Sequence, residues 1–331
     1  MTARLTRRDA LKLGLGTALG LGAAGCGSDN GPLSGPHTRA VERTSIAIDY
    51  ASYYAPAPDL IRLAQDHARA RGLATTFSDD PSGSAAQVAS VKALTGPRGG
   101  FKVVVVAPFD AAVLDAIVQD AMSRGVSVVS FVSPLRHATA AIGVDAAGAA
   151  RQLVSHARAH AGHQPQVLLV LPPARSPIPD PFFGYATGAA QALRQATAAA
   201  GLDVAATVTA LGTPDGRDAV RAALAQHPDV TTVLTWNDAT ALGAAAALPR
   251  TAYVGGLGAP AVTTAAPLHA LDAGGPLRCL VAARLATLAG ALIDVPATVL
   301  KGAKPSTAPV PIEVFTAGAQ TTRAALKDYA A

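Results

Sequence analysis

The sequence predicts an α/β protein made of two doubly wound lobes, each built on a parallel sheet. Three observations carry this prediction. Short runs rich in β-branched residues alternate with longer stretches whose apolar residues recur every three or four positions, and this happens in two successive series. The strand run at 232–235 is short, β-branched and apolar, which is typical of a parallel strand covered on both faces. The 331 residues, 50% of them hydrophobic and 15% charged, are enough for two hydrophobic cores.

The first series, from Thr44 to Gly143, predicts alternating strands and helices. Such an alternation requires right-handed crossovers between neighbouring parallel strands. The predicted strands are 45–49, 74–77, 102–107 and 127–131, and the predicted helices are 59–70, 84–94 and 110–123.

The second series begins again at Asp145. Its predicted strands are 166–171, 204–210, 232–235, 251–254 and 269–271, and its predicted helices are 149–159, 186–200, 217–225, 239–248 and 260–265. A further long helix is predicted at 277–292, and it would pack on the first lobe.

Residues 1–25 are typical of an export signal. Arg7 and Arg8 precede an apolar, Gly-rich stretch that is too short to span a bilayer as a permanent helix. The paired arginines favour a twin-arginine signal, but Ala10 stands where that pattern usually has Phe, so the general secretory route stays open.

Cys26 stands directly behind the apolar stretch, and the residues before it resemble a bacterial lipoprotein cleavage box. A lipid on Cys26 would hold the exported protein in the cell envelope, on the outer face of the cytoplasmic membrane or on the periplasmic side. Residues 26–43 would then form the lipidated cysteine and a flexible tether, because Gly, Ser, Pro and polar groups dominate there.

Charge and cysteine content exclude several functions. The net charge of +5 falls to +2 without residues 1–25, which hold four basic residues and one acidic residue, so nucleic acid is not an expected partner. Cys26 and Cys279 are the only cysteines, which excludes a disulfide framework and a cysteine-based metal site.

The strand predicted at 232–235 is followed by Trp236, Asn237 and Asp238. Open α/β sheets bind ligands in the crevice outside the carboxyl ends of their strands. An indole face beside an amide offers stacking together with a hydrogen-bond donor and acceptor, which suits a small polar ligand. Asp238 has a second interpretation, because an Asp directly before an Ala-rich segment is also a good helix N-cap.

Aromatic residues are few, and their positions are grouped. Only 4% of the chain is aromatic, yet eight of the fourteen aromatic residues fall at or just beyond the carboxyl end of a predicted strand. They are Tyr50, Tyr53, Tyr54, Phe131, Phe182, Phe183, Tyr185 and Trp236. The grouping predicts a stacking site between the lobes, although core packing stays open for each single ring. Arg175, in the Pro-rich loop 172–181, could meet an anionic or hydroxyl-bearing ligand or simply be solvated.

Catalytic and metal-binding patterns are weak. The chain has neither a Gly-x-Ser-x-Gly elbow nor a P-loop, and 254–258 matches the dinucleotide fingerprint poorly, so we expect neither enzyme activity nor a cofactor. His156 and His160 share a helical face that could hold a metal, but the helix dipole also favours histidines near a helix end, so we expect no metal. Asp110 and Asp145 precede helical stretches and are expected to cap them.

Several segments, taken in order, resemble the type I periplasmic binding proteins, in the ribose and sugar branch that serves ABC importers. Residues 103–112, VVVVAPFDAA, are similar to the strand-Pro-x-Asp-helix element of that family, and 125–131, GVSVVSF, to its next strand. Residues 142–148 resemble its crossover into the second lobe, and 227–244, which include Asn237, are the closest match. The likeness runs from about residue 45 to residue 304.

The resemblance implies two lobes that are joined by three crossovers and close on a ligand like a hinge. It implies a first lobe of 44–143 plus about 275–304 and a second lobe of 144–273 plus about 309–331. It also implies a monomeric protein that passes a small molecule to an ABC permease and performs no chemistry.

The sugar-binding residues of the family are only partly retained. Asn237 stands where the family has a ligand-binding Asn. Other residues stand at six positions where the family has polar or charged sugar contacts: Tyr54, Val132, Ser133, Tyr185, Leu257 and Gly274. Because each unpaired buried polar group costs about 1–3 kcal/mol, a polyol would be held poorly here. We therefore predict a ligand with a flatter or more apolar body than free ribose, such as a nucleoside, an aryl compound or a modified sugar.

The predicted ligand-binding residues are Tyr53, Tyr54, Phe131, Ser133, Arg175, Phe183, Tyr185, Trp236, Asn237 and Asp238. Two other functions stay open. A ligand sensor would present the same closed lobes to a receptor, whereas an exported α/β enzyme would need a nucleophile or a metal set that the sequence does not offer convincingly.

Overall fold

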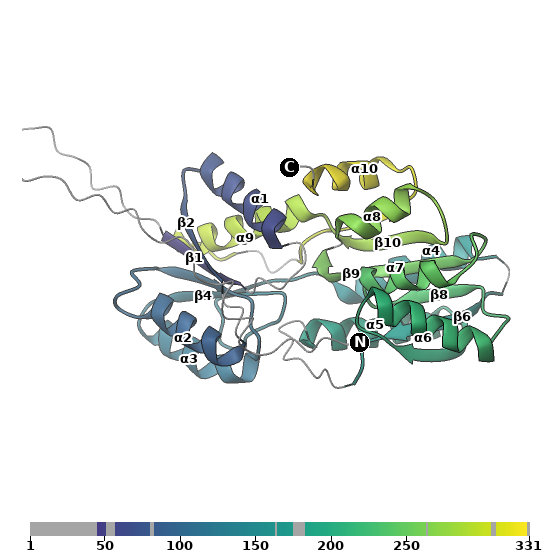
Figure 1. The fold of residues 1–331 in the computed structure, drawn as a ribbon. Coiled ribbons are helices and arrows are strands. Elements are labelled where there is room, and N and C mark those ends of the chain that lie inside the picture. Colours follow the sequence, from purple (N-terminus) through teal and green to yellow (C-terminus); the bar gives the residue numbers. More distant parts are fainter. Residues whose placement is uncertain are drawn as a thin grey trace, which may run out of the picture. The chain divides into compact units, whose positions relative to one another are not determined.

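The computed structural model describes residues 45–50, 57–79, 83–162, 164–174, 183–262, 264–305 and 309–329. Within them the chain forms two α/β lobes, each with its own sheet, as predicted (Figure 1). Among the described residues no helix combines the length and the apolar character that crossing a membrane requires.

The first sheet has five parallel strands in the order β2-β1-β3-β4-β5. The strands are β1 (Ser45–Tyr50), β2 (Ala74–Asp79), β3 (Val103–Val106), β4 (Ser127–Phe131) and β5 (Ala140–Ile142). Its helices are α1 (Ala57–Ala70), α2 (Ser84–Thr95), α3 (Ala111–Ser123) and, from much later in the chain, α9 (Leu285–Leu300).

Both faces of the first sheet are buried. Successive side chains of a strand point to opposite faces, and accordingly Val103 and Val105 join a core with α1 and α9, while Val104 and Val106 join a core with α2 and α3. This double burial explains why the β3 sequence is an uninterrupted run of valines.

The second sheet has six strands in the order β11-β10-β9-β8-β6-β7, and only the pairing of β10 with β11 is antiparallel. The strands are β6 (Gln166–Leu171), β7 (Asp203–Thr209), β8 (Thr232–Thr235), β9 (Tyr253–Val262), β10 (Leu277–Ala283) and β11 (Ile312–Thr316). The helices are α4 (Ala146–His160), α5 (Phe183–Ala199), α6 (Thr213–Gln226), α7 (Asp238–Ala247), α8 (Ala265–Asp272), α10 (Gln320–Leu326) and the short 3-10 helix η2 (Lys327–Tyr329). Helices α4 and α5 cover one face of this sheet, and α6, α7, α8 and α10 cover the other.

The described chain passes between the lobes three times: from β5 to α4, from β10 to α9 and from α9 to β11. The first and third passages run side by side, because Val144 forms a parallel bridge with Val310, whose amide donates to the Gly143 carbonyl over 2.8 Å. The second passage is very short, since Arg284 alone stands between the end of β10 and the start of α9.

Three predicted elements were wrong. The predicted helix 277–292 begins with strand β10, so Leu277–Ala283 lies in the second sheet and not in the first lobe, where the prediction placed 275–304. The predicted strand 269–271 lies inside α8, and the predicted helix 260–265 overlaps the end of β9. Short apolar runs do not distinguish strand from helix. Pairing with distant strands decided the conformation of Leu277–Ala283 and of the end of β9, whereas 269–271 continues the helix that begins at Ala265.

Candidate ligand-binding site at the carboxyl ends of the strands

Trp236 is fixed between the ends of neighbouring strands in the second lobe. Its backbone amide donates to the carbonyl of Val170 on β6 over 3.0 Å, and its indole Nε1 donates to the carbonyl of Ala210, just after β7, over 2.9 Å. The residue is 5% exposed. The sequence therefore located this residue correctly at a strand end, but most of the ring surface is covered by protein.

Asn237 is the N-cap of α7. Its backbone is extended (φ −145°, ψ 163°), and its side-chain Oδ1 accepts from the amide of Thr240 over 2.6 Å, as an N-cap does. Its Nδ2 donates to the carbonyl of Leu211 over 3.1 Å. The amide group, 3% exposed as a residue, is thus oriented by one bond on each of its polar atoms.

Asp238 is not the cap, contrary to its second interpretation from the sequence. It is the first residue of α7, because the chain turns helical one residue earlier than an Asp cap would require. Its Oδ2 accepts from the backbone amide and the hydroxyl of Thr264, over 2.7 and 3.3 Å. The carboxylate therefore ties the start of α7 to the start of α8, and its negative charge suits a helix N-terminus.

Residues 236 and 237 form the β8–α7 turn, between the end of β8 and the start of α7. Gly256 on β9 lets this turn pack closely against β9. A Cβ at that position would lie 2.8 Å from Thr235 Oγ1 and from Ala241 Cβ, and 3.2 Å from the carbonyl oxygen of Asn237. A side chain at residue 256 would displace the turn that carries Asn237.

Tyr185 and Phe131 lie mainly inside the protein. The Tyr185 hydroxyl donates to the carbonyl of Gly258 over 2.8 Å, and its ring packs in the core under α4 and α5 beside buried Leu257. Phe131 is 2% exposed and packs in the first-lobe core with α1 and α9. An apolar ring at a strand end can serve packing as well as stacking, and we remove Phe131 from the proposed site.

Ser133 follows a strained turn at the first passage between the lobes. Val132 has φ 65°, which is rare for a β-branched residue, and the Ser133 amide donates back to the Phe131 carbonyl over 2.8 Å. Val132 packs against cores of both lobes. Strain of this kind gathers at functional and switch regions of proteins.

The structure does not describe the side chains of the remaining predicted site residues. Tyr53, Tyr54, Arg175 and Cys26 lie outside the described residues, and the structure gives only the backbone of Phe183, at the start of α5. Their assignment to a site stays a prediction.

A buried polar cluster in the first lobe was missed by sequence reasoning. Gln87 on α2 donates through Nε2 to Asp49 Oδ1 and to the Ala107 carbonyl, each over 2.8 Å, and its Oε1 accepts from the Phe109 amide over 2.7 Å. Ser90 donates to the other Asp49 oxygen over 2.5 Å. The cluster fixes the carboxyl ends of β1 and β3. The available signals were an Asp that ends an apolar strand and a Gln four residues before Val91 on the apolar face of its helix.

Two expected helix caps are confirmed. Asp110 accepts from the amides of Ala112 and Val113 at the start of α3, over 3.0 and 3.3 Å. Asp145 accepts from the amide of Gly148 at the start of α4, over 2.8 Å.

The chain matches the periplasmic binding protein domain over residues 53–275, which is more than half of its 331 residues. The chain belongs to the periplasmic binding protein family. This confirms the resemblance seen in the sequence. A comparison with curated proteins found no match.

Solved structures agree on the fold of this periplasmic binding protein. A periplasmic ribose ABC transporter protein from Conexibacter woesei is 19% identical with a TM-score of 0.73, and the match covers 86% of this chain and 95% of that one. A solute-binding protein from Bacillus halodurans with bound myo-inositol is 17% identical with a TM-score of 0.71, covering 87% and 98%. A Caulobacter myo-inositol binding protein is 19% identical with a TM-score of 0.68, covering 88% and 98%. At these identities the likeness establishes the fold.

The histidines on α4 of this periplasmic binding protein lie apart from the strand ends that carry Asn237. His156 Nδ1 is 2.8 Å from the Tyr253 hydroxyl, and the His156 ring stacks on that of His160 with centroids 4.1 Å apart. Burial, with a smaller contribution from His160, lowers the pKa of His156. The described residues contain no group of three or more metal-binding side chains.

Proposed function

We propose that the protein is an exported, lipid-anchored solute-binding protein that captures a small molecule between its two lobes and delivers it to an ABC importer. The observation that carries the proposal is the β8–α7 turn. Asn237 stands at the carboxyl end of a central strand, where the family has a ligand-binding Asn, and its amide is held in a fixed orientation by Thr240 and Leu211. A preorganised amide is suited to recognising a hydroxyl or a base edge.

The ligand we propose is sugar-like, a nucleoside or an aryl compound. Similar solved proteins are described with ribose, myo-inositol and D-allose, which supports a small polyhydroxylated or ring-shaped ligand. Two departures favour a less polar body than free ribose. Leu257 is fully buried in the core, and the Tyr185 hydroxyl already donates to a backbone carbonyl, so neither replaces the charged sugar partners of the family.

A thermal-shift screen of the full chain carrying Cys26→Ser tests this function. Sugars, inositols, nucleosides and small aromatic compounds are the probes. A ligand at one hundred times its dissociation constant adds about 2.7 kcal/mol to stability, which such a screen detects. No shift with any of these compounds would contradict the proposed ligand classes.

Variants then test the site. Asn237→Ser keeps a capping oxygen but loses the amide, so the ligand-induced shift should disappear. Thr197→Ala is the control, because it removes a buried hydrogen bond to Leu193 within α5, away from the carboxyl ends of the strands. If Asn237→Ser binds the ligand as tightly as the Thr197→Ala control does, the role of Asn237 is refuted.

The lipid anchor on Cys26 is tested separately. We expect the chain that keeps Cys26, and is lipidated there, to partition into the detergent phase of a cloud-point extraction and the Cys26→Ser chain to partition into the aqueous phase. Equal partitioning of the two would argue against lipidation and leave only export.

A further inference from the structure

The 3-10 helix η2, at residues 327–329, makes a contact between the lobes in addition to the three covalent passages. Helix α10 packs on β11 and α8 of the second lobe, and the Thr322 hydroxyl donates to the Thr316 carbonyl over 2.7 Å. The 3-10 helix η2 follows immediately, yet it contacts α1 of the first lobe. Residues 327–329, called the strap below, therefore continue from one lobe to the other.

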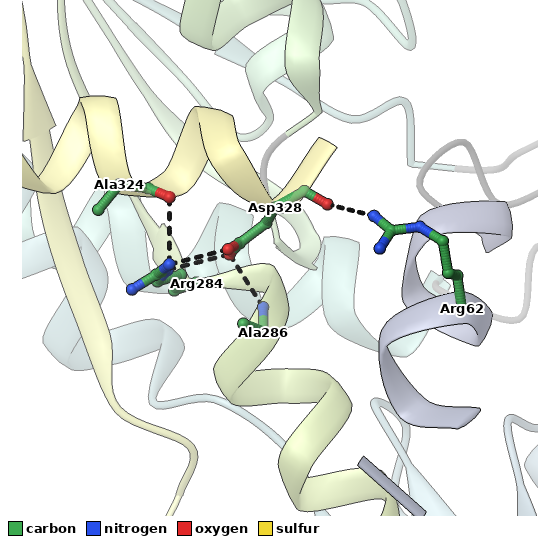
Figure 2. A network of polar contacts seen from close by, with 5 residues as sticks. All are labelled: Arg62, Arg284, Ala286, Ala324 and Asp328. Carbon is green, nitrogen blue, oxygen red and sulfur yellow. Dashed lines mark hydrogen bonds and ion pairs between the residues drawn. The ribbon is translucent and has the colours of Figure 1, made fainter. Parts of the chain in front are cut away.

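Asp328 anchors the strap at the second passage. Its carboxylate accepts from Arg284 Nη2 over 2.8 Å and from Arg284 Nε over 3.0 Å, and it also accepts from the backbone amide of Ala286 over 3.1 Å (Figure 2). Arg284 occupies the N-cap position of α9 but makes no side-chain cap. Asp328 thus supplies a negative charge and a hydrogen-bond acceptor to the N-terminus of a first-lobe helix from the far end of the chain.

Arg62 holds the strap from the first lobe. Its Nη2 donates over 2.7 Å to the backbone carbonyl of Asp328, as Figure 2 shows, so this bond does not use the carboxylate that Arg284 holds. Arg284 in turn donates to the Ala324 carbonyl at the end of α10 over 3.1 Å. The strap is therefore held by both lobes and by the residue that connects them.

Tyr329 places the strap close to the proposed site. Its side chain packs against the first-lobe core with α1 and against the second-lobe core with α7 and α8. Its pKa is raised by burial and, to a lesser extent, by the charges of Asp238, Asp328 and Asp59. Asp59 belongs to α1 and Asp238 to α7, next to Asn237, so Tyr329 lies between helices of the two lobes.

We propose that the strap is a fourth, non-covalent connection between the lobes, in which Arg62 and Asp328 are positioning residues that restrain hinge opening. When the lobes rotate apart, Arg62 moves with α1 while α10 stays on the second sheet, so the bond from Arg62 to the Asp328 carbonyl must break or the strap must leave α10. The restraint keeps the first-lobe helix α1 at a fixed distance from the β8–α7 turn that carries Asn237. Only this last consequence rests on the proposed function.

Distances between spin labels on the two lobes test the restraint without any ligand. Labels at Gln119→Cys on α3 and Ala222→Cys on α6 are both exposed, whereas the native Cys279 is buried and is not labelled. The full chain also carries Cys26→Ser. We expect Arg62→Met to broaden the distance distribution and add longer distances, because methionine has a similar length but no donor.

The control is Arg71→Met. Arg71 also loses an ion pair, to Asp294, but that pair joins two first-lobe elements, so the distances should stay as in the parent. A chain ending at Leu326 lacks the strap and should broaden at least as much as Arg62→Met. If this shorter chain does not fold, Arg62→Met against Arg71→Met decides alone. Unchanged distances in Arg62→Met would overturn the proposal.

Once a ligand is known, Arg62→Met should weaken its binding by up to about fivefold, since loss of one hydrogen bond shifts the equilibrium constant toward the open form by about that factor. The proposed function and the proposed strap are tested by different measurements, so one can be refuted without the other. A screen without any hit would count against the proposed function, while the label distances would still support or overturn the strap.

Discussion

Replacing Asn237 by alanine should destabilise the second lobe by about 2 kcal/mol. Loss of the N-cap, which leaves the Thr240 amide without its acceptor, costs about 1 kcal/mol. Loss of the Nδ2 donor leaves the Leu211 carbonyl without this partner and costs about 1 kcal/mol more. The two bonds use different atoms of one side chain, so the costs should nearly add.

Urea unfolding of the Cys26→Ser chain without ligand measures this effect. Asn237→Ser separates the two terms, because a serine hydroxyl can cap α7 but cannot reach the Leu211 carbonyl as an amide donor. We expect Asn237→Ser to cost about 1 kcal/mol, half as much as Asn237→Ala. Equal losses in the two variants, or a loss below about 0.5 kcal/mol in Asn237→Ala, would refute the capping role.

Three further predictions concern packing and titration. Gly243→Ala would place a Cβ 2.2 Å from the Thr213 carbonyl oxygen and push α6 from α7, costing about 2 kcal/mol in urea unfolding, whereas Gly188→Ala meets nothing within 4 Å and should not destabilise. The lowered pKa of His156 means that the unfolded chain binds its proton more readily. The free energy of unfolding of the parent chain, measured relative to that of a His156→Gln variant, should therefore be highest above the usual pKa of 6.5 and decline as the pH falls below it. A difference between the two chains that does not change with pH would contradict this. Burial raises the pKa of Cys279 to about 12, even though a hydrogen bond from Tyr253 lowers it, so iodoacetamide should modify this thiol only after unfolding; rapid reaction of the folded chain would disprove it.

The two-lobe fold could be predicted because burial on both faces leaves a local trace in the sequence. Runs such as Val103–Val106 are apolar at every position, and the helices between them keep a three-to-four spacing. Strand β10 left no such trace, because Leu277–Ala283 runs into α9 with Arg284 alone between them. Its identity as a strand depends on pairing with β9 and β11, which come from other parts of the chain.

The candidate site was predictable in place but not in detail. The carboxyl end of β8 is visible in the sequence, and Trp236 and Asn237 stand there. The partners that decide what their polar groups can do are distant in sequence: Ala210 and Leu211 lie in the loop after β7, and the Tyr185 hydroxyl finds its acceptor 73 residues away. Local composition carries no information about such pairs.

The brevity of the second passage has a mechanical consequence. A linker of one residue cannot stretch, so β10 and α9 cannot move apart at Arg284, and any rearrangement there has to be a rotation about its two backbone dihedrals. Arg284 is then a pivot, and helix α9 is the lever that carries its rotation across the first sheet. The guanidinium that Asp328 grips belongs to this same residue. The strap therefore holds the residue about which the lobes would turn, where a small rotation gives a large displacement at the distant rims of the lobes.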